Sequence, residues 1–123
     1  MGDERPFQLI EGATAAGTGA MDWGRLVWIA NRASSGIEAT VGYVEIFPHT
    51  GNPVHRHHTC SEIMVVLEGT INHIVGEESV TLKKGDALLV PPGMRHGAIN
   101  IGSTTARMIV AYDTGERDFE VAE

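Results

Sequence analysis

Short apolar runs separated by turn residues constrain the fold of this 123-residue chain most strongly. Most runs span only a few residues and are bounded by glycine, proline or asparagine, which are typical of turns. No segment longer than about ten residues places apolar side chains at the 3.6-residue period of an α-helix. A succession of about eight or nine short strands is typical of an antiparallel sandwich or barrel. We therefore expect a single all-β domain.

The alternation of side chains predicts where the strands lie. In residues 37–47, Tyr43 and Glu45 share one face, whereas Val44 and Ile46 lie on the other. Both faces of this strand carry apolar residues, which predicts packing on each side. The expected strands cover residues 25–31, 37–47, 62–67, 70–75, 79–82, 87–90, 95–101 and 106–112.

The two ends of the chain differ in composition from its centre. Residues 11–21 are small and rich in glycine, so we expect residues 1–22 to form a leader that is flexible or exchanged between subunits. The β-barrel is expected over residues 23–112. Residues 113–123 contain five acidic side chains, which predicts a solvated acidic tail.

Charge and composition exclude several classes of partner. The chain has 16 acidic and 9 basic residues, and its lysines and arginines form no cluster, so we expect no nucleic acid partner and no anionic membrane surface. Its longest apolar runs are far shorter than the roughly 20 residues that span a bilayer. One cysteine forms no internal disulfide, and the first residues do not resemble a signal peptide, which predicts a cytoplasmic protein.

Three histidines lie close together at residues 55–58. In an extended chain His55 and His57 project to the same side, whereas His58 projects to the other. Glu62 follows at an odd offset, and a hairpin at residues 58–61 would return its carboxylate to the two imidazoles. Because a buried, unpaired carboxylate costs several kcal/mol, this acid at the start of an apolar strand needs a cation or an exposed position.

A metal site accounts for this combination of residues. Borderline divalent metals bind imidazole nitrogens, and one carboxylate adds charge and an oxygen ligand. His49, His73 and His96 are further candidates, and His96 follows a proline turn that would let it approach from a neighbouring strand. The alternative is that the clustered histidines are solvated loop residues that bind nothing.

Two gapped motifs resemble those of the cupin superfamily, whose members are small double-stranded β-helix barrels. Residues 55–69 read H-x-H-x4-E-x6-G, and residues 85–100 read G-x5-P-x-G-x2-H-x3-N. The second motif matches at every defining position, and the 15-residue spacer between the motifs is like that of compact bacterial cupins. One position departs from the pattern, because His49 stands where a glycine usually precedes the first histidine.

The resemblance implies that His55, His57, Glu62 and His96 bind one divalent metal ion inside the barrel, with positions left open for water or substrate. Iron, manganese, nickel and zinc all suit such ligands. The resemblance also implies a homodimer, since small barrels often cover exposed edge strands by pairing subunits. A register in which His58 replaces His57 would lose the i, i+2 relation with His55.

Further residues near the motifs have an expected place in the site or in the core. His73 shares the strand parity of its apolar neighbours, so we expect either a general base or a buried histidine bonded to a backbone carbonyl. Met64 is expected in the wall of a substrate pocket, and Asn100 is expected as a polar contact. Cys60 is interpreted as a small turn residue, with a soft ligand or a redox-sensitive thiol as the alternatives.

Different classes of function follow from a metal-binding barrel. The resemblance implies a metal-dependent enzyme, such as a dioxygenase, isomerase, decarboxylase or lyase, that acts on a small oxygen-rich organic molecule. The alternatives are a non-catalytic cupin that binds an organic acid or a sugar, and a barrel with a mainly structural metal. A site closed by four protein ligands, without an adjoining cavity, would favour the structural metal.

Overall fold

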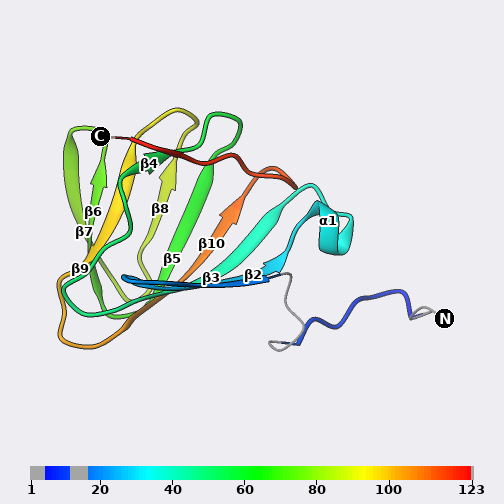
Figure 1. Cartoon of the computed structure of the whole chain (residues 1–123), viewed down its shortest axis with the longest axis horizontal. Coiled ribbons are helices and arrows are strands. Elements are labelled where there is room, and N and C mark those ends of the chain that lie inside the picture. The colour runs from blue at the N-terminus through cyan, green and yellow to red at the C-terminus, as the bar shows by residue number, and fades with distance from the viewer. Residues whose placement is uncertain (1–4, 12–16, 123) are drawn as a thin grey trace.

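The computed structural model describes residues 5–11 and 17–122, which fold into two antiparallel β-sheets (Figure 1). The first sheet has the strand order β1-β2-β3-β10-β5-β8, and the second has the order β11-β4-β9-β6-β7. The strands of the first sheet are β1 (Gly17–Met21), β2 (Gly24–Ala30), β3 (Thr40–Ile46), β10 (Ala106–Tyr112), β5 (Glu62–Glu68) and β8 (Ala87–Val90). Those of the second are β11 (Glu120–Val121), β4 (His55–Arg56), β9 (His96–Asn100), β6 (Thr70–Val75) and β7 (Glu78–Lys83). The predicted all-β class is confirmed.

The hydrophobic core lies between the two sheets. In β3 the even-numbered residues are buried, so Val44 and Ile46 face the core, while Tyr43 and Glu45 face outward. Alternate residues of β5 and β10 are buried in the same way, as expected for strands with one face on a core. The core residues with the lowest exposure include Ile46, Met64, Val66, Ile71, Ala98 and Met108.

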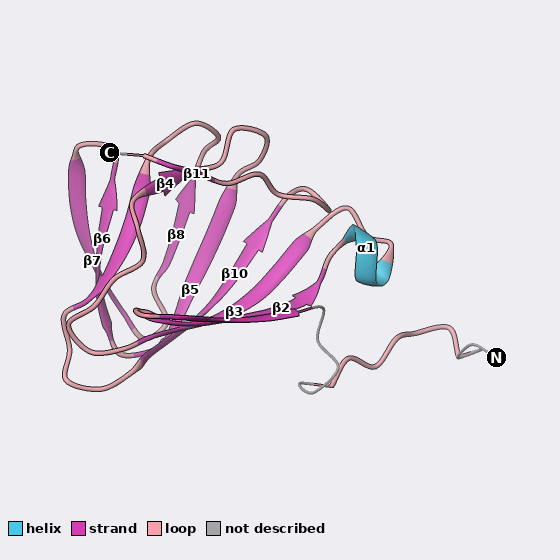
Figure 2. Cartoon of the chain, in the orientation of Figure 1, coloured by secondary structure: helices cyan, strands magenta, loops and turns pink. Residues whose placement is uncertain are grey.

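A single helical turn, α1 (Arg32–Ser35), interrupts the strands (Figure 2). The side chain of Asn31 accepts a hydrogen bond from the backbone N–H of Ser34 at 2.8 Å and caps the turn. Gly36 ends it with a left-handed backbone, at a φ of 67°. One turn is too short to show a helical period in the sequence, so this helix was not predicted. The next strand was expected from residue 37. Within the described residues, no helix is long and apolar enough to cross a membrane.

Two positions with positive φ shape the turns near the motifs. Gly69 connects β5 in the first sheet to β6 in the second at a φ of 93°, and an added Cβ would lie 2.9 Å from the Cβ of Ala106. His49 has a φ of 60° and is the one non-glycine residue with positive φ among the described residues. This conformation is uncommon for residues with a side chain. It explains why glycine is usual at this position of the motif.

Two local predictions for the first half of the chain are wrong. Residues 17–21 were expected in a flexible leader but form β1, which pairs with β2 along its whole length. Residues 1–4 and 12–16 of that leader lie outside the described residues. Residues 58–61 were expected to form a hairpin, but β4 and β5 belong to different sheets. The segment therefore crosses from one sheet to the other. Exchange of residues 1–22 between subunits stays a prediction.

The C-terminal segment, residues 113–122, is held on the barrel by backbone contacts, while its acidic side chains Asp113, Glu116 and Glu120 are exposed, as the sequence predicts. Its strand β11 pairs with β4 and places Val121 opposite His55. The side chain of Ala122 is buried, and its backbone N–H donates to the carbonyl of Val54 at 2.8 Å. The red C-terminal trace in Figure 1 crosses the open end of the barrel beside β4. The pairing of β11 with β4 and the hydrogen bond of Ala122 thus hold this acidic segment on the barrel.

Candidate metal centre

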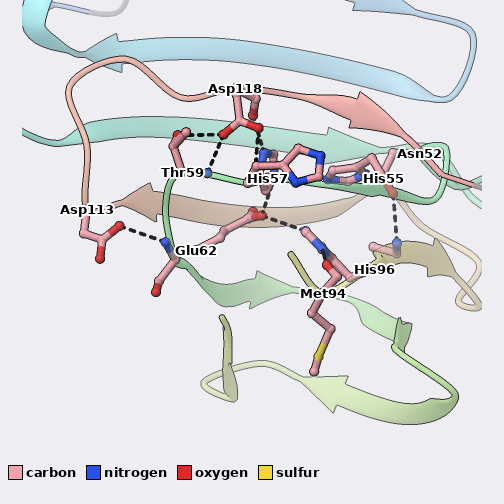
Figure 3. Close-up of polar contacts among 12 residues, drawn as sticks. Asn52, His55, His57, Thr59, Glu62, Met94, His96, Asp113 and Asp118 are labelled. Carbon is pink, nitrogen blue, oxygen red and sulfur yellow. Dashed lines mark hydrogen bonds and ion pairs between the residues drawn. The ribbon is translucent and has the colours of Figure 1, made fainter. Parts of the chain in front are cut away.

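Three histidines and one glutamate converge between the two sheets (Figure 3). His55 lies in β4 directly opposite His96 in β9, which joins the two sequence motifs in space. His57 follows β4, and Glu62 begins β5 in the facing sheet. One nitrogen or oxygen atom from each side chain lies within 4.8 Å of the others. All four side chains are buried, so the predicted set of residues forms one cluster.

Backbone carbonyls fix the orientation of the three imidazole rings. A carbonyl oxygen only accepts, so each ring that contacts one through Nδ1 carries its proton there. In the neutral ring, Nε2 then carries the lone pair and points toward the centre of the cluster, as metal binding requires. The Nδ1 atoms donate from His55 to Pro53 at 2.7 Å, from His57 to Asp118 at 2.6 Å and from His96 to Met94 at 3.0 Å.

The carboxylate of Glu62 lies between two of these rings. Its Oε1 atom is 3.1 Å from Nε2 of His57 and 2.8 Å from Nε2 of His96. Burial raises the pKa of Glu62, but hydrogen bonds and charge from these two histidines outweigh burial and lower the pKa to about 2. Burial lowers the pKa of His55 to about 4. The cluster therefore combines a buried carboxylate with at least one neutral imidazole at neutral pH.

This set of donors fits a divalent metal ion. His57 and His96 have already committed their Nδ1 protons to carbonyls, yet their Nε2 atoms face a carboxylate oxygen that only accepts. Either each ring carries a second proton, or a cation lies between these atoms. A divalent ion satisfies the lone pairs and compensates the buried charge. Imidazole and carboxylate suit several first-row metals, so the identity of the metal stays open.

A cavity of about 410 Å³ lies beside the cluster. His55, Glu62 and His96 border it, so four protein ligands do not seal the centre from this side. The remaining walls are mostly apolar. They include Trp23, Leu26, Trp28, Met64, Met108 and Val110. Met64 thus lies in the wall of a cavity, which is the position expected from the sequence.

His73 borders the same cavity and is almost completely buried. Its ring stacks on that of His96 with centroids 5.7 Å apart. Neither ring nitrogen has a hydrogen-bond partner among the described residues, so the expected bond to a carbonyl is not found. Burial, and then the charge of His96, lowers the pKa of His73 to about 4. A neutral imidazole is therefore available to a molecule in the cavity, and its catalytic role stays a prediction.

Asn100 is the last residue of β9, and its side chain bonds across the turn that follows. Its amide nitrogen donates to the carbonyls of Ile46 at 2.9 Å and Thr104 at 2.8 Å, and its oxygen accepts from the N–H of Gly102 at 2.9 Å. The side chain is fully buried, and Asn100 is not among the residues that border the cavity. This geometry gives Asn100 a structural role in the turn and no support for a substrate contact.

The other histidines and the cysteine lie outside the cluster. His58 is exposed and faces away from His57, as the parity of the segment predicts. His49 is also exposed. Cys60 is buried in the hydrophobic core, where burial raises the pKa of its thiol. It is not one of the four clustered donors, so nothing here supports a role as a ligand.

The C-terminal segment supplies contacts that sequence reasoning missed. The carbonyl of Asp118 orients His57, while its carboxylate accepts from the backbone N–H groups of His58 at 2.6 Å and Thr59 at 2.9 Å. The ring of Phe119 stacks on that of His55 with centroids 4.8 Å apart. His57 and Asp118 are 61 positions apart in the chain, and no local pattern signals their contact.

Sequence comparison identifies related proteins. The family profile described as "Cupin domain" (Cupin_2) matches residues 42–112. Germin-like protein 1 of Brassica napus is 29% identical over 96 residues, which cover 74% of this chain and 46% of that protein. Germin-like protein 3-8 of Oryza sativa is 31% identical over 80 residues, which cover 61% of this chain and 36% of that protein. The chain spans less than half the length of these plant relatives.

Several solved structures have the same fold. An oxalate oxidase in complex with the substrate analogue glycolate superposes with a TM-score of 0.80 at 19% identity, covering 97% of this chain and 66% of that chain. A variant of oxalate decarboxylase from Bacillus subtilis gives 0.76 at 17% identity, with 82% and 28% covered. An uncharacterized conserved protein with a double-stranded β-helix domain from Klebsiella pneumoniae gives 0.75 at 21% identity, with 83% and 86% covered.

At these identities the structural likeness shows the fold alone, and that fold is the double-stranded β-helix that the sequence motifs imply. The matched region of the family profile contains both motifs and all four clustered residues. It also covers more than half of the chain. The protein therefore belongs to the cupin family.

Proposed function

We propose that this protein is a metal-dependent enzyme that acts on a small organic molecule, with one divalent ion held by His55, His57, Glu62 and His96. The observation that carries the proposal is the position of the cluster at the border of a cavity of about 410 Å³. A ligand oxygen has access to the ion from the cavity side. A purely structural metal is typically closed by its four protein ligands and has no need of an adjoining cavity.

A divalent ion bound here supplies Lewis-acid or redox chemistry to a ligand oxygen. The protein's own residues hold and orient the reacting molecule. Backbone carbonyls keep the histidine rings in one tautomer, and the apolar walls exclude water from the ligand. Within the described part of the chain, neither the N–H nor the other ring nitrogen of His73 has a partner beside the centre. The glycolate bound to the similarly folded oxalate oxidase supports an organic acid as the ligand.

A non-catalytic cupin that binds a small molecule is the second candidate. The mostly apolar lining favours it, because few polar side chains beside the cluster are free to transfer a proton. Binding without turnover would distinguish the two candidates. A metal-loaded protein that binds an organic acid and returns it unchanged, as judged by mass spectrometry, is a binding protein.

Elemental analysis after dialysis against a chelator and reloading tests the metal site. We expect about one divalent ion per chain, because three imidazoles and one carboxylate form a complete ligand set. His57→Ala and His96→Ala should each lose most of the bound metal. His49→Asn is the matched control, since His49 is exposed and asparagine tolerates its positive φ. Full metal content in both cluster variants would refute the site.

A further inference from the structure

We infer that the cavity binds a carboxylic acid with an aromatic body, and that Arg117 binds its carboxylate. The inference rests on the proposed function in using the same cavity, but it names the ligand class and a residue outside the metal cluster. Arg117 is the one arginine or lysine among the described residues that line the cavity. It belongs to the C-terminal segment, which the sequence presented as a solvated tail.

Three aromatic rings hold the side chain of Arg117 at the cavity. Its guanidinium carbon lies 4.4 Å from the ring centroid of Trp28, 5.6 Å from that of Tyr112 and 5.4 Å from that of Phe119. All three rings also line the cavity. Stacking of this kind attracts the cation to the ring faces and reduces its freedom to move. The guanidinium is therefore placed at the border of the cavity before any ligand arrives.

The guanidinium of Arg117 has no carboxylate partner in the part of the chain that the structure describes. The neighbouring acids in its segment face other groups. The carboxylate of Asp118 accepts from His58 and Thr59, and that of Glu116 lies 3.9 Å from Arg32. A stacked guanidinium keeps its N–H groups in one plane and can donate two of them to a carboxylate. A half-buried, unpaired cation at the cavity favours an anionic ligand group.

The walls of the cavity favour an aromatic body for this ligand. The indole of Trp28 packs over Gly42, where an added Cβ would lie 2.8 Å from the ring, so this glycine makes room for the indole. Aromatic rings and the thioethers of Met64 and Met108 pack well against a flat ring. A sugar would bury its hydroxyl groups against these apolar walls without partners, at a cost in free energy. A diacid as small as oxalate would leave the same walls in contact with water.

The same two aromatic rings lie near both the clustered histidines and Arg117. The ring of Tyr112 lies 5.0 Å from that of His57 and 5.6 Å from the guanidinium of Arg117. The ring of Phe119 similarly lies 4.8 Å from that of His55 and 5.4 Å from the guanidinium. Tyr112 and Phe119 therefore each lie beside both a clustered histidine and Arg117. A single-ring acid would pack against these rings with its carboxylate at Arg117.

Binding of three probes tests this inference. The probes are 3-phenylpropanoate, its neutral counterpart 3-phenylpropan-1-ol, and oxalate, which lacks an apolar body. Trp23 and Trp28 line the cavity, so their fluorescence reports binding, and equilibrium dialysis checks the affinities. In the metal-free protein we expect 3-phenylpropanoate to bind at least about tenfold more tightly than the alcohol, because a hydrogen bond to a charged partner is worth that much. It should also bind more tightly than oxalate, because oxalate buries no apolar surface against the walls.

Variants assign the preference to Arg117. We expect Arg117→Gln to weaken binding of 3-phenylpropanoate about tenfold and to leave binding of the alcohol unchanged. Arg117→Lys keeps the charge and should retain part of the preference for 3-phenylpropanoate over the alcohol. This variant tests the role of Arg117 even if the glutamine variant does not fold. Lys84→Gln removes one positive charge from an exposed turn and serves as the matched control. Equal affinity for acid and alcohol in the wild type, or unchanged binding in Arg117→Gln, would overturn the inference.

The same measurements on zinc-loaded protein separate this inference from the proposed function. The dependence on Arg117 should persist, whereas a carboxylate bound by the ion alone would be insensitive to Arg117→Gln and would contradict the assignment. Oxalate binding as tightly as 3-phenylpropanoate would refute the aromatic body. Failure of the cluster to hold metal would refute the proposed function and leave the metal-free result standing.

Discussion

Two buried histidines should make the metal-free protein sensitive to mild acid. Burial lowers the pKa of His55 and of His73 to about 4, against 6.5 for an ordinary histidine. Between these values the unfolded chain binds a proton on each ring and the folded protein does not. The free energy of unfolding therefore falls as the pH decreases from 6.5 toward 4, because protons favour the state that binds more of them.

The size of the effect follows from these values. Between pH 7 and pH 5 each ring should reduce the free energy of unfolding by about 2 kcal/mol, and the two together by about 4 kcal/mol. Glu62 does not contribute in this interval. Its folded pKa of about 2 lies below the ordinary 4.5, so its stabilising effect is fully present above pH 4.5 and is lost only in stronger acid.

His73→Leu isolates one of the two rings. The free energy of unfolding is measured in urea at pH 7 and at pH 5, with chelator present and with tryptophan fluorescence as the signal. From pH 7 to pH 5 it should fall by about 2 kcal/mol less in His73→Leu than in the wild type. At pH 7 the variant should be at least as stable as the wild type, since both nitrogens of His73 lack partners among the residues that the structure describes. His49→Asn removes an exposed histidine, so its free energy of unfolding should fall between pH 7 and pH 5 by as much as that of the wild type. The same loss in His73→Leu as in the wild type would refute the reasoning from burial.

Two other predictions concern the C-terminal segment and the assembly. Asp118→Ala removes the carboxylate that holds this segment over residues 58–59, so metal affinity should fall about tenfold in a competition titration with a chromophoric chelator, whereas the exposed Glu116→Ala should bind metal normally. We also expect a homodimer, because Phe7 and Leu9 are 58% and 61% exposed and β1 and β8 leave open edges on the first sheet. Light scattering at micromolar concentration that gives a 13.2 kDa particle would contradict this.

Local patterns made much of the barrel predictable. The strands expected over residues 70–75, 87–90 and 106–112 have the same bounds in the structure. Side-chain alternation is a property of neighbouring residues, so it predicts a strand even when the strands that pair with it are unknown. The parity of His55 and His57 is local in the same sense. The approach of His96 depends on pairing between strands, and its prediction came from the motif and from the turn before it.

Contacts between distant segments were not predictable from such patterns. The crossing at residues 58–61 depends on which sheet each flanking strand joins, and the sequence of the loop carries no sign of that choice. Most acids of the C-terminal segment are exposed, as clustered acids usually are, but that pattern carries no sign that the segment pairs with β4. Here the carboxylate of Asp118 accepts hydrogen bonds from a loop 59 and 60 positions earlier in the chain.

Residues 117–119 contact the clustered histidines and also supply the guanidinium at the cavity. The carboxylate of Asp118 binds the backbone of the loop after His57, and this contact places its own carbonyl against the imidazole Nδ1. Arg117, the preceding residue, extends toward the rings at the cavity, and Phe119, the next residue, stacks on His55. Movement of this segment would shift the guanidinium and the orientation of two clustered histidines at the same time. We therefore expect the proposed metal affinity and the inferred preference for an acidic ligand to be coupled, so that substitutions that loosen residues 117–119 reduce both.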